Sequence, residues 1–141
     1  MLRLLSHPNQ SLEEHMRLVN KWGQHYLECN GIISKKNIDK EILRSFFIFH
    51  DIGKGTHYFQ TYINKKKVDQ NLKQHSAISA MLFLYYHIIT GSIQQQEDII
   101  LMMAYAILKH HSNLDKFSEI YEYTSRENHE KIDLLQTQYK A

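Results

Sequence analysis

Histidine is the residue type that stands out in this sequence, with ten copies among 141 residues. Imidazole is the commonest metal ligand in proteins and titrates close to neutral pH. One of the histidines precedes an aspartate in the pair His50–Asp51, and two more form the pair His110–His111. Imidazoles and carboxylates that meet in space bind divalent cations. These pairs are therefore the first candidates for chemistry.

The pair His50–Asp51 closes an apolar segment, FFIFHDIGKG, in which Gly53 is expected to turn the chain. Adjacent residues of a helix point about 100° apart, so they reach one place most easily at a helix end or when two metal ions share them. A carboxylate has two acceptor oxygens, so Asp51 can bridge two cations. The pair His110–His111 is expected to close a later helix in the same way.

His15 and His75 complete the candidate ligands, with His15 inside a predicted helix and His75 near the start of another. A single histidine on an apolar helix is more often a core residue than a ligand, and a His–Asp dipeptide alone is a weak signal. The combination of His–Asp before a glycine, a later histidine opening a helix and a closing histidine pair is much more specific. The remaining histidines match no such position and are interpreted as surface or core residues: His7, His25, His57, His87 and His129.

The elements that must position these residues are predicted to be helices, because the chain has one Pro and five Gly and little alternation of polar and apolar residues. Ser11 and Glu14 form a capping-box pattern, and Asn30–Gly31 is expected to stop the first helix. The apolar stripe of that helix is expected to comprise Leu12, His15, Met16, Val19, Trp22 and Tyr26. The predicted helices cover residues 12–29, 37–51, 57–64, 72–90 and 94–111, with a charged loop over 65–71 and patches of helix after residue 112.

The overall composition indicates one all-α domain that spans residues 1–141. The sequence has no uncharged apolar run long enough to cross a membrane and no signal-peptide pattern at its start, so a cytoplasmic location without membrane contact is expected. Cys29 is the single cysteine, which excludes an internal disulfide. The net charge of +2 permits a nucleic-acid partner without requiring one.

In order and context, the segments HDIGK, HYFQTYI, QHSAISA and KHHS resemble the HD superfamily of metal-dependent phosphohydrolases. Within it, the chain is similar to the nuclease domain of type I CRISPR nuclease-helicases, whose His–Asp motif is followed by Gly–Lys and then Phe–Gln. The matching elements are Leu12 to His15, Gly53–Lys54, Phe59–Gln60, His75 to Ala80, and His110 to Ser112, where Ser112 stands in place of the more usual Gly. The resemblance implies an HD-domain helical bundle.

The resemblance also implies a role for each matched residue. One metal ion would be held by His15, His50 and Asp51. A second would be held by Asp51, His75, His110 and His111. The family has a further downstream Asp that neither Asp115 nor Asp133 matches in context, so the domain is expected to be C-terminally incomplete or degenerate.

Lys54 is implied to sit beside the scissile phosphate as a catalytic point charge, together with Asp51. The alternative for Lys54 is a lysine that the dipole of the preceding helix favours. Four further lysines, Lys65, Lys66, Lys67 and Lys73, are candidates for a DNA-backbone track or for a solvated loop. Three aromatic residues could stack on bases or pack in the core: Tyr58, Phe59 and Tyr62.

The leading hypothesis is a nuclease with two divalent metal ions that cleaves single-stranded DNA in CRISPR interference, together with a helicase subunit or domain and a surveillance complex. Cations activate water and neutralise charge on the phosphate, and imidazole-rich ligation suits Mn, Fe, Co, Ni or Zn better than Mg, although Mg is also used by this family. Two alternatives remain open: an HD phosphohydrolase of nucleotides or cyclic nucleotides, and a non-catalytic HD module that only docks a partner.

Overall fold

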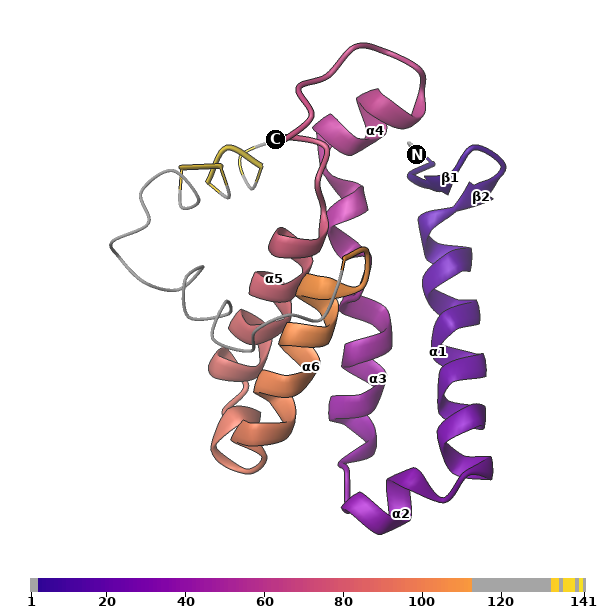
Figure 1. Ribbon diagram of the computed structural model, residues 1–141, viewed down its shortest axis with the longest axis vertical. Coiled ribbons are helices and arrows are strands. Elements are labelled where there is room, and N and C mark those ends of the chain that lie inside the picture. Colours follow the sequence, from indigo (N-terminus) through magenta and orange to yellow (C-terminus); the bar gives the residue numbers. More distant parts are fainter. Residues whose placement is uncertain (1–2, 113–132, 135, 139, 141) are drawn as a thin grey trace.

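The chain forms a small hairpin followed by helices joined by short loops (Figure 1). The computed structural model describes residues 3–112, 133–134, 136–138 and 140. The elements up to Lys109 are β1 (Leu5–His7), β2 (Gln10–Ser11), α1 (Leu12–Cys29), α2 (Ile32–Lys36), α3 (Lys40–Phe49), the 3₁₀ helix η1 (Ile52–Gly55), α4 (His57–Ile63), α5 (Ser76–Ile89), the 3₁₀ helix η2 (Ser92–Gln94) and α6 (Glu97–Lys109). The prediction of an all-α domain is confirmed, since the antiparallel hairpin is the one sheet in the described residues.

Local capping chemistry sets where the first long helices begin. The side chain of Ser11 accepts a hydrogen bond of 3.2 Å from the backbone N–H of Glu14, as the sequence pattern predicted. Asp39 caps α3 by accepting from the N–H groups of Glu41 and Ile42. Helix α3 starts later than the predicted residue 37. Asn37 has a left-handed backbone conformation with φ of 49°, which a right-handed helix cannot include.

Several short elements were not predicted: the hairpin, α2, η1 and η2. Their segments are too short to carry a periodic apolar pattern, although Pro8 and Asn9 are typical turn residues. The predicted starts of α5 and α6 were also wrong, because these helices begin at Ser76 and Glu97. Of the helix predicted after residue 112, residues 133–134 and 136–138 are helical, and the rest lies outside the described residues.

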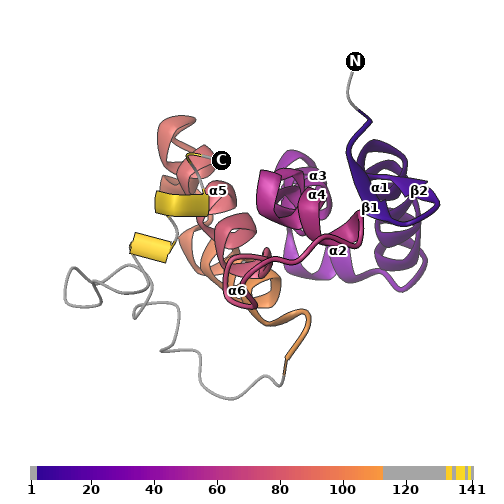
Figure 2. The same ribbon diagram turned by 90° about the horizontal axis from the view of Figure 1, so that it is seen from above.

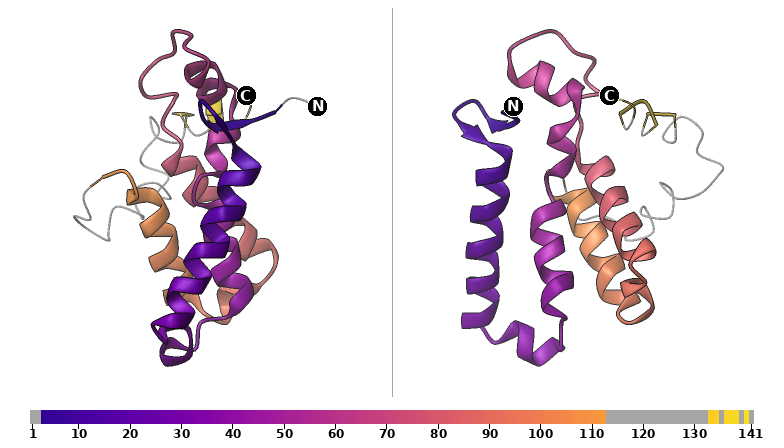
Figure 3. Two further views of the ribbon diagram at one scale, coloured as in Figure 1. Left: turned by 90° about the vertical axis from the view of Figure 1, so that its right-hand side faces the viewer. Right: turned by 180° about the vertical axis from the view of Figure 1, so that it is seen from behind.

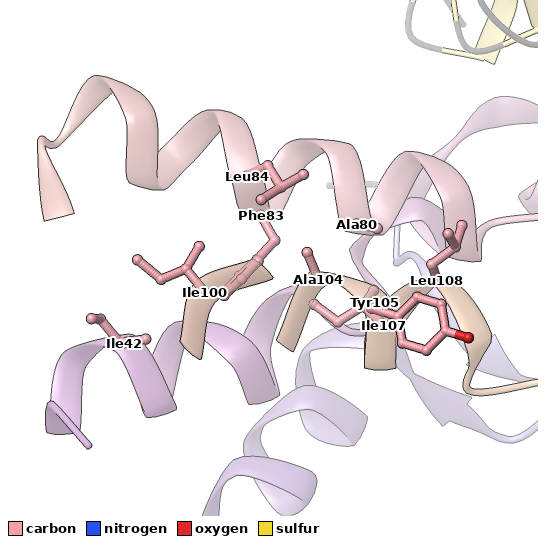
Figure 4. Close-up of a cluster of buried hydrophobic side chains, with 9 residues drawn as sticks. All are labelled: Ile42, Ala80, Phe83, Leu84, Ile100, Ala104, Tyr105, Ile107 and Leu108. Atoms are coloured by element: carbon pink, nitrogen blue, oxygen red, sulfur yellow. The ribbon is translucent and has the colours of Figure 1, made fainter. Parts of the chain in front are cut away.

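The hydrophobic core lies where α3, α5 and α6 pack together (Figure 4). Phe83 of α5 is fully buried, and Figure 4 shows it directed towards Ile100 of α6, with Ile42 of α3 beside them. Burial of each such side chain stabilises the fold by about 1.5–3 kcal/mol. This core joins the three helices whose ends carry His50–Asp51, His75 and His110–His111.

Helix α1 lies outside this core, and α3 lies between α1 and the α5–α6 pair (Figure 2). Gly23 allows the close approach of α1 to α3, because a Cβ atom at this position would overlap the ring of Phe47. The predicted apolar stripe was wrong at its far end, since Trp22 is 60% exposed and Tyr26 is 64% exposed. Helix α1 packs mainly against α3, so much of its surface stays uncovered. None of the described helices is long and apolar enough to cross a membrane.

Candidate metal centre

The ends of several helices meet at one place and bring together histidines that are far apart in the sequence. His50 is the C-cap of α3, and Asp51 follows it. His75 is the N-cap residue of α5, and His110 is the C-cap of α6. Because the core holds these three helices side by side, their adjoining ends converge without any sequence proximity.

Asp51 is the centre of this convergence, and its side chain is almost fully buried. Its Oδ2 atom lies 2.8 Å from Nζ of Lys54 and 2.9 Å from Nε2 of His15. Its Oδ1 atom lies 2.9 Å from Nε2 of His75 and 3.2 Å from Nε2 of His110. One carboxylate therefore contacts side chains from α1, η1, α5 and the end of α6.

The ligand atoms fall into two groups that share Asp51. In each group the ligand atoms lie within 4.8 Å of one another. The first group is His15, His50 and Asp51, and the second is Asp51, His75, His110 and His111. The structure thus brings together all six residues that were predicted as metal ligands, in the two sets that the resemblance implied.

The hydrogen bonds at the far side of two rings show which nitrogen faces the centre. The Nδ1 atoms of His50 and His110 donate to the carbonyl oxygens of Phe47 and Ile107, at 2.7 Å and 2.6 Å. In the neutral ring this leaves Nε2 as a lone pair directed towards Asp51. Lone pairs that face a carboxylate repel it unless a positive charge lies between them, so these residues fit divalent cations.

Contacts between imidazole nitrogens lead to the same conclusion. Nε2 of His75 lies 3.1 Å from Nε2 of His111, and Nε2 of His15 lies 3.3 Å from Nε2 of His50. At most one nitrogen of each neutral pair can carry a proton, and the other must present a lone pair. A cation between the two nitrogens would accept both lone pairs.

The charge states that the fold imposes also suit metal binding. Burial raises the pKa of Asp51, but its contacts with His110, His50, His75 and Lys54 outweigh burial and hold the pKa well below its usual range. Burial, followed by the nearby His110 and His75, lowers the pKa of His111 to about 4. Burial also lowers the pKa values of His15 and His75. Metal ligands must be deprotonated, and these groups are so at neutral pH.

Gly53 and Ser79 position Asp51 against α5. A Cβ atom at Gly53 would overlap the carbonyl oxygen of His75 and the side chain of Ile78, so only glycine lets η1 approach this closely. The backbone N–H of Gly53 donates to Oγ of buried Ser79 at 2.9 Å. Gly53 was expected to turn the chain, and it lies in the 3₁₀ helix η1 that follows α3; its missing side chain also allows close packing against α5.

Gln60 holds the hairpin against the site, a role that the sequence did not reveal. Its Nε2 atom donates to the carbonyl oxygens of Leu5 and Lys54, and its Oε1 atom accepts from the N–H of Leu5. The neighbouring Phe59 is buried, and its ring lies 5.1 Å from that of His75. The Phe–Gln element was visible as a motif, but only the position of the hairpin explains it.

An open pocket of about 600 Å³ adjoins the ligand groups. Its lining includes Lys54, His75 and His111 of the site, together with Lys65 and Lys66. Lys54 is itself only 5% exposed, so it is not a solvated helix-end lysine. Of the other two candidate DNA-binding residues, Lys67 is exposed but does not line the pocket, and Lys73 packs on the ring of Tyr62.

The remaining histidines lie outside the ligand groups. His25 and His57 are exposed and His87 is buried, as surface and core residues were expected to be. His7 was not singled out, but its ring lies 5.2 Å from that of His15, and it lines the pocket. His129 and Asp115 lie outside the described residues. Asp133 is exposed.

An all-α fold whose helix ends gather imidazoles around one shared carboxylate defines a class of helical metal-binding hydrolases. The family model of the HD domain matches residues 12–137 of this chain, and the chain belongs to that family. Membership indicates metal-dependent phosphohydrolase activity, and HD domains bind divalent metals. No curated protein and no solved structure matches the chain.

Proposed function

We propose that this chain is a two-metal nuclease that cleaves single-stranded DNA in CRISPR interference, with a helicase subunit or domain and a surveillance complex as partners. The observation that carries the proposal is Asp51, whose two oxygens face two ligand groups beside an open pocket that Lys54, Lys65 and Lys66 line. The sequence resemblance to type I CRISPR nuclease domains supports the choice of substrate and partners.

The two sites would be held by the groups already described. When bound, the cations supply an activated water and neutralise charge on the scissile phosphate. Asp51 would contribute one ligand to each ion, and its carboxylate is held in place because it is buried and contacts residues of four elements. His50 and His110 keep their Nε2 lone pairs directed inwards through their backbone hydrogen bonds.

Lys54, Lys65 and Lys66 give the pocket its affinity for a phosphate backbone. Lys54 lies at the ligand end of the pocket and places a positive charge beside the position of the scissile phosphate. Lys65 and Lys66 also line the pocket, where they would contact neighbouring phosphates of the bound strand. The open shape of the pocket admits a strand that passes through it.

The test is a cleavage assay of the full chain on circular single-stranded DNA, with Mn²⁺, Ni²⁺, Co²⁺, Fe²⁺, Zn²⁺ or Mg²⁺ added to metal-free protein. We expect cutting with at least one of the transition metals and none with EDTA. The His57→Ala variant, which changes an exposed histidine outside both groups, should cut like the wild type. Absence of cutting by protein with metal bound would remove the nuclease proposal.

A phosphohydrolase of nucleotides or cyclic nucleotides is the second candidate, because a pocket of about 600 Å³ also suits one small ligand. Turnover of a nucleotide panel by metal-loaded protein, without cutting of polymeric DNA, would favour this candidate. If the protein binds no divalent metal at all, both enzymes are excluded and a docking module remains.

A further inference from the structure

The pocket beside the metal ligands has an apolar side that phosphate binding does not use. Its charged end carries Lys54, whereas Tyr62 and Ile63 of α4 and Pro8 of the hairpin contribute apolar surface. The hairpin and α4 lie at the same end of the molecule (Figure 3). A pocket that combines a buried lysine with an apolar surface fits a ligand that carries both an anionic group and a flat aromatic group.

Tyr62 is the aromatic residue of this wall, and it is 44% exposed although Phe59, one turn earlier, is buried. Nζ of Lys73 lies 4.3 Å from the centre of the Tyr62 ring. Tyr62 lines the pocket and Lys73 does not. The contact with Lys73 restrains the Tyr62 ring at the border of the pocket.

Phe59 connects this ring to the metal centre. Its ring lies 6.0 Å from that of Tyr62 and 5.1 Å from that of His75, edge-on in both contacts. Tyr62 is thus separated from a candidate metal ligand by a single buried ring. This spacing suits the base and the phosphate of one nucleotide.

We propose that Tyr62 is a stacking platform for the base of the nucleotide bound at the metal centre, and that Lys65 and Lys66 contact the adjoining backbone phosphates. This inference rests on the proposed function, because it assigns the strand-binding surface of the same site. Every base has a π-face, so the platform binds single strands without reading their sequence. An aromatic base is bound by Tyr62, and a bare sugar–phosphate backbone is bound only by the lysines.

The test compares the binding of two fluorescein-labelled strands by fluorescence anisotropy: an octathymidylate, and an abasic strand of equal length and charge. The full chain is used in EDTA, so no strand is cut and the result does not depend on catalysis. We expect the wild type to bind octathymidylate about ten-fold more tightly than the abasic strand. Tyr62→Ala should abolish this preference by weakening octathymidylate binding alone, whereas Tyr62→Trp should retain it.

Two further variants separate stacking from charge and from general effects. Tyr26→Ala removes an exposed tyrosine of α1 that does not line the pocket, and it should keep the preference. The double variant Lys65→Ala, Lys66→Ala should weaken both strands equally and reduce the slope of log affinity against log salt by about 1.4.

The inference is overturned if the wild type shows no preference for bases, or if Tyr62→Ala keeps that preference. A preference that depends on Tyr62 supports the inference even if metal-loaded protein cuts no DNA. In that outcome the nuclease proposal fails while the strand-binding surface stands.

Discussion

Asp51 is the residue on which both candidate metal sites depend, because each ligand group uses its carboxylate. His15 and His111 each belong to one group only. Removing a shared ligand should therefore affect two ions, and removing an unshared ligand should affect one. This difference distinguishes a bridged pair of sites from two independent sites.

We expect Asp51→Asn to weaken the binding of both divalent ions by at least about 100-fold, since losing even an outer partner of a ligand costs about 10–100-fold. His15→Ala and His111→Ala should each lose one ion and keep the other. Isothermal titration with Mn²⁺, together with elemental analysis, measures the stoichiometry. His25→Ala, in an exposed histidine of α1, is the control. Two ions retained by Asp51→Asn would contradict the shared carboxylate.

Lys54 is the one full positive charge next to this buried carboxylate among the described residues, at 2.8 Å from Oδ2. Both side chains are nearly inaccessible, with 6% and 4% of their surface exposed. In Lys54→Met the carboxylate keeps its charge and loses its counter-ion. Breaking a buried pair in this way costs about 3–5 kcal/mol.

We therefore expect metal-free Lys54→Met to be less stable than the wild type by about 3 kcal/mol in urea unfolding. Saturating Mn²⁺ should restore most of this loss, because a cation bound by Asp51 replaces the missing ammonium group. Lys36→Met, at an exposed position of α2, should leave the free energy of unfolding unchanged. A metal-free Lys54→Met protein as stable as the wild type would show that the ion pair is not needed.

At the scale of elements, the sequence predicted helix interiors better than helix ends. Ser11 and the Asn30–Gly31 stop placed α1 correctly, because caps are local chemistry. The start of α5 was placed too early, because the apolar periodicity does not show that His75 is its N-cap. The exposure of Trp22 depends on how many helices cover α1, which is a tertiary property.

The sequence predicted the ligand residues of the candidate site, but not the residues that hold those ligands in position. His50–Asp51 and His110–His111 are visible as adjacent pairs, because both residues of each pair act at a helix end. Gln60 and Ser79 act through hydrogen bonds to segments that only folding brings near. Their roles follow from distances that no local pattern encodes.

The junction between η1 and α5 depends on the missing side chain of Gly53. We expect Gly53→Ala to destabilise the protein by about 1–3 kcal/mol, because the carbonyl of His75 cannot move aside without shifting α5. The same shift separates Asp51 from His75 and should weaken metal binding. Gly55→Ala is the matched control, because its Cβ atom would meet only side-chain atoms at an ordinary 3.7 Å. Equal stability and metal affinity of the two variants would contradict this role for Gly53.

At the scale of the whole molecule, one histidine of the core links stability to pH independently of the metal ligands. His87 of α5 is 1% exposed, and its Nε2 atom lies 2.8 Å from Oγ of Ser45 on α3. The Ser45 hydroxyl donates its single proton to the carbonyl of Ile42, so it must accept from Nε2–H of His87. The Nδ1 atom is then an unprotonated nitrogen, buried and without a partner in the described part of the chain.

Burial lowers the pKa of His87, and Asp39 offsets this only in part. A histidine in an unfolded chain titrates near pH 6.5. Below this pH the unfolded chain takes up a proton at His87 that the folded chain still excludes. The free energy of unfolding therefore decreases as the pH falls below about 6.5, and above that pH His87 contributes no pH dependence.

His87→Leu removes this proton uptake and leaves the bond from Ser45 to Ile42 in place. We expect its free energy of unfolding to fall less than that of the wild type between pH 7.5 and pH 5.5, measured by urea unfolding in metal-free buffer. Other histidines with a lowered pKa, such as His75 and His111, also make the wild type acid-sensitive. The comparison cancels their contribution because both proteins contain them. His25→Leu should follow the wild-type curve, since His25 is exposed. Parallel curves for His87→Leu and the wild type would show that the folded core accepts the proton at His87 as readily as the unfolded chain does.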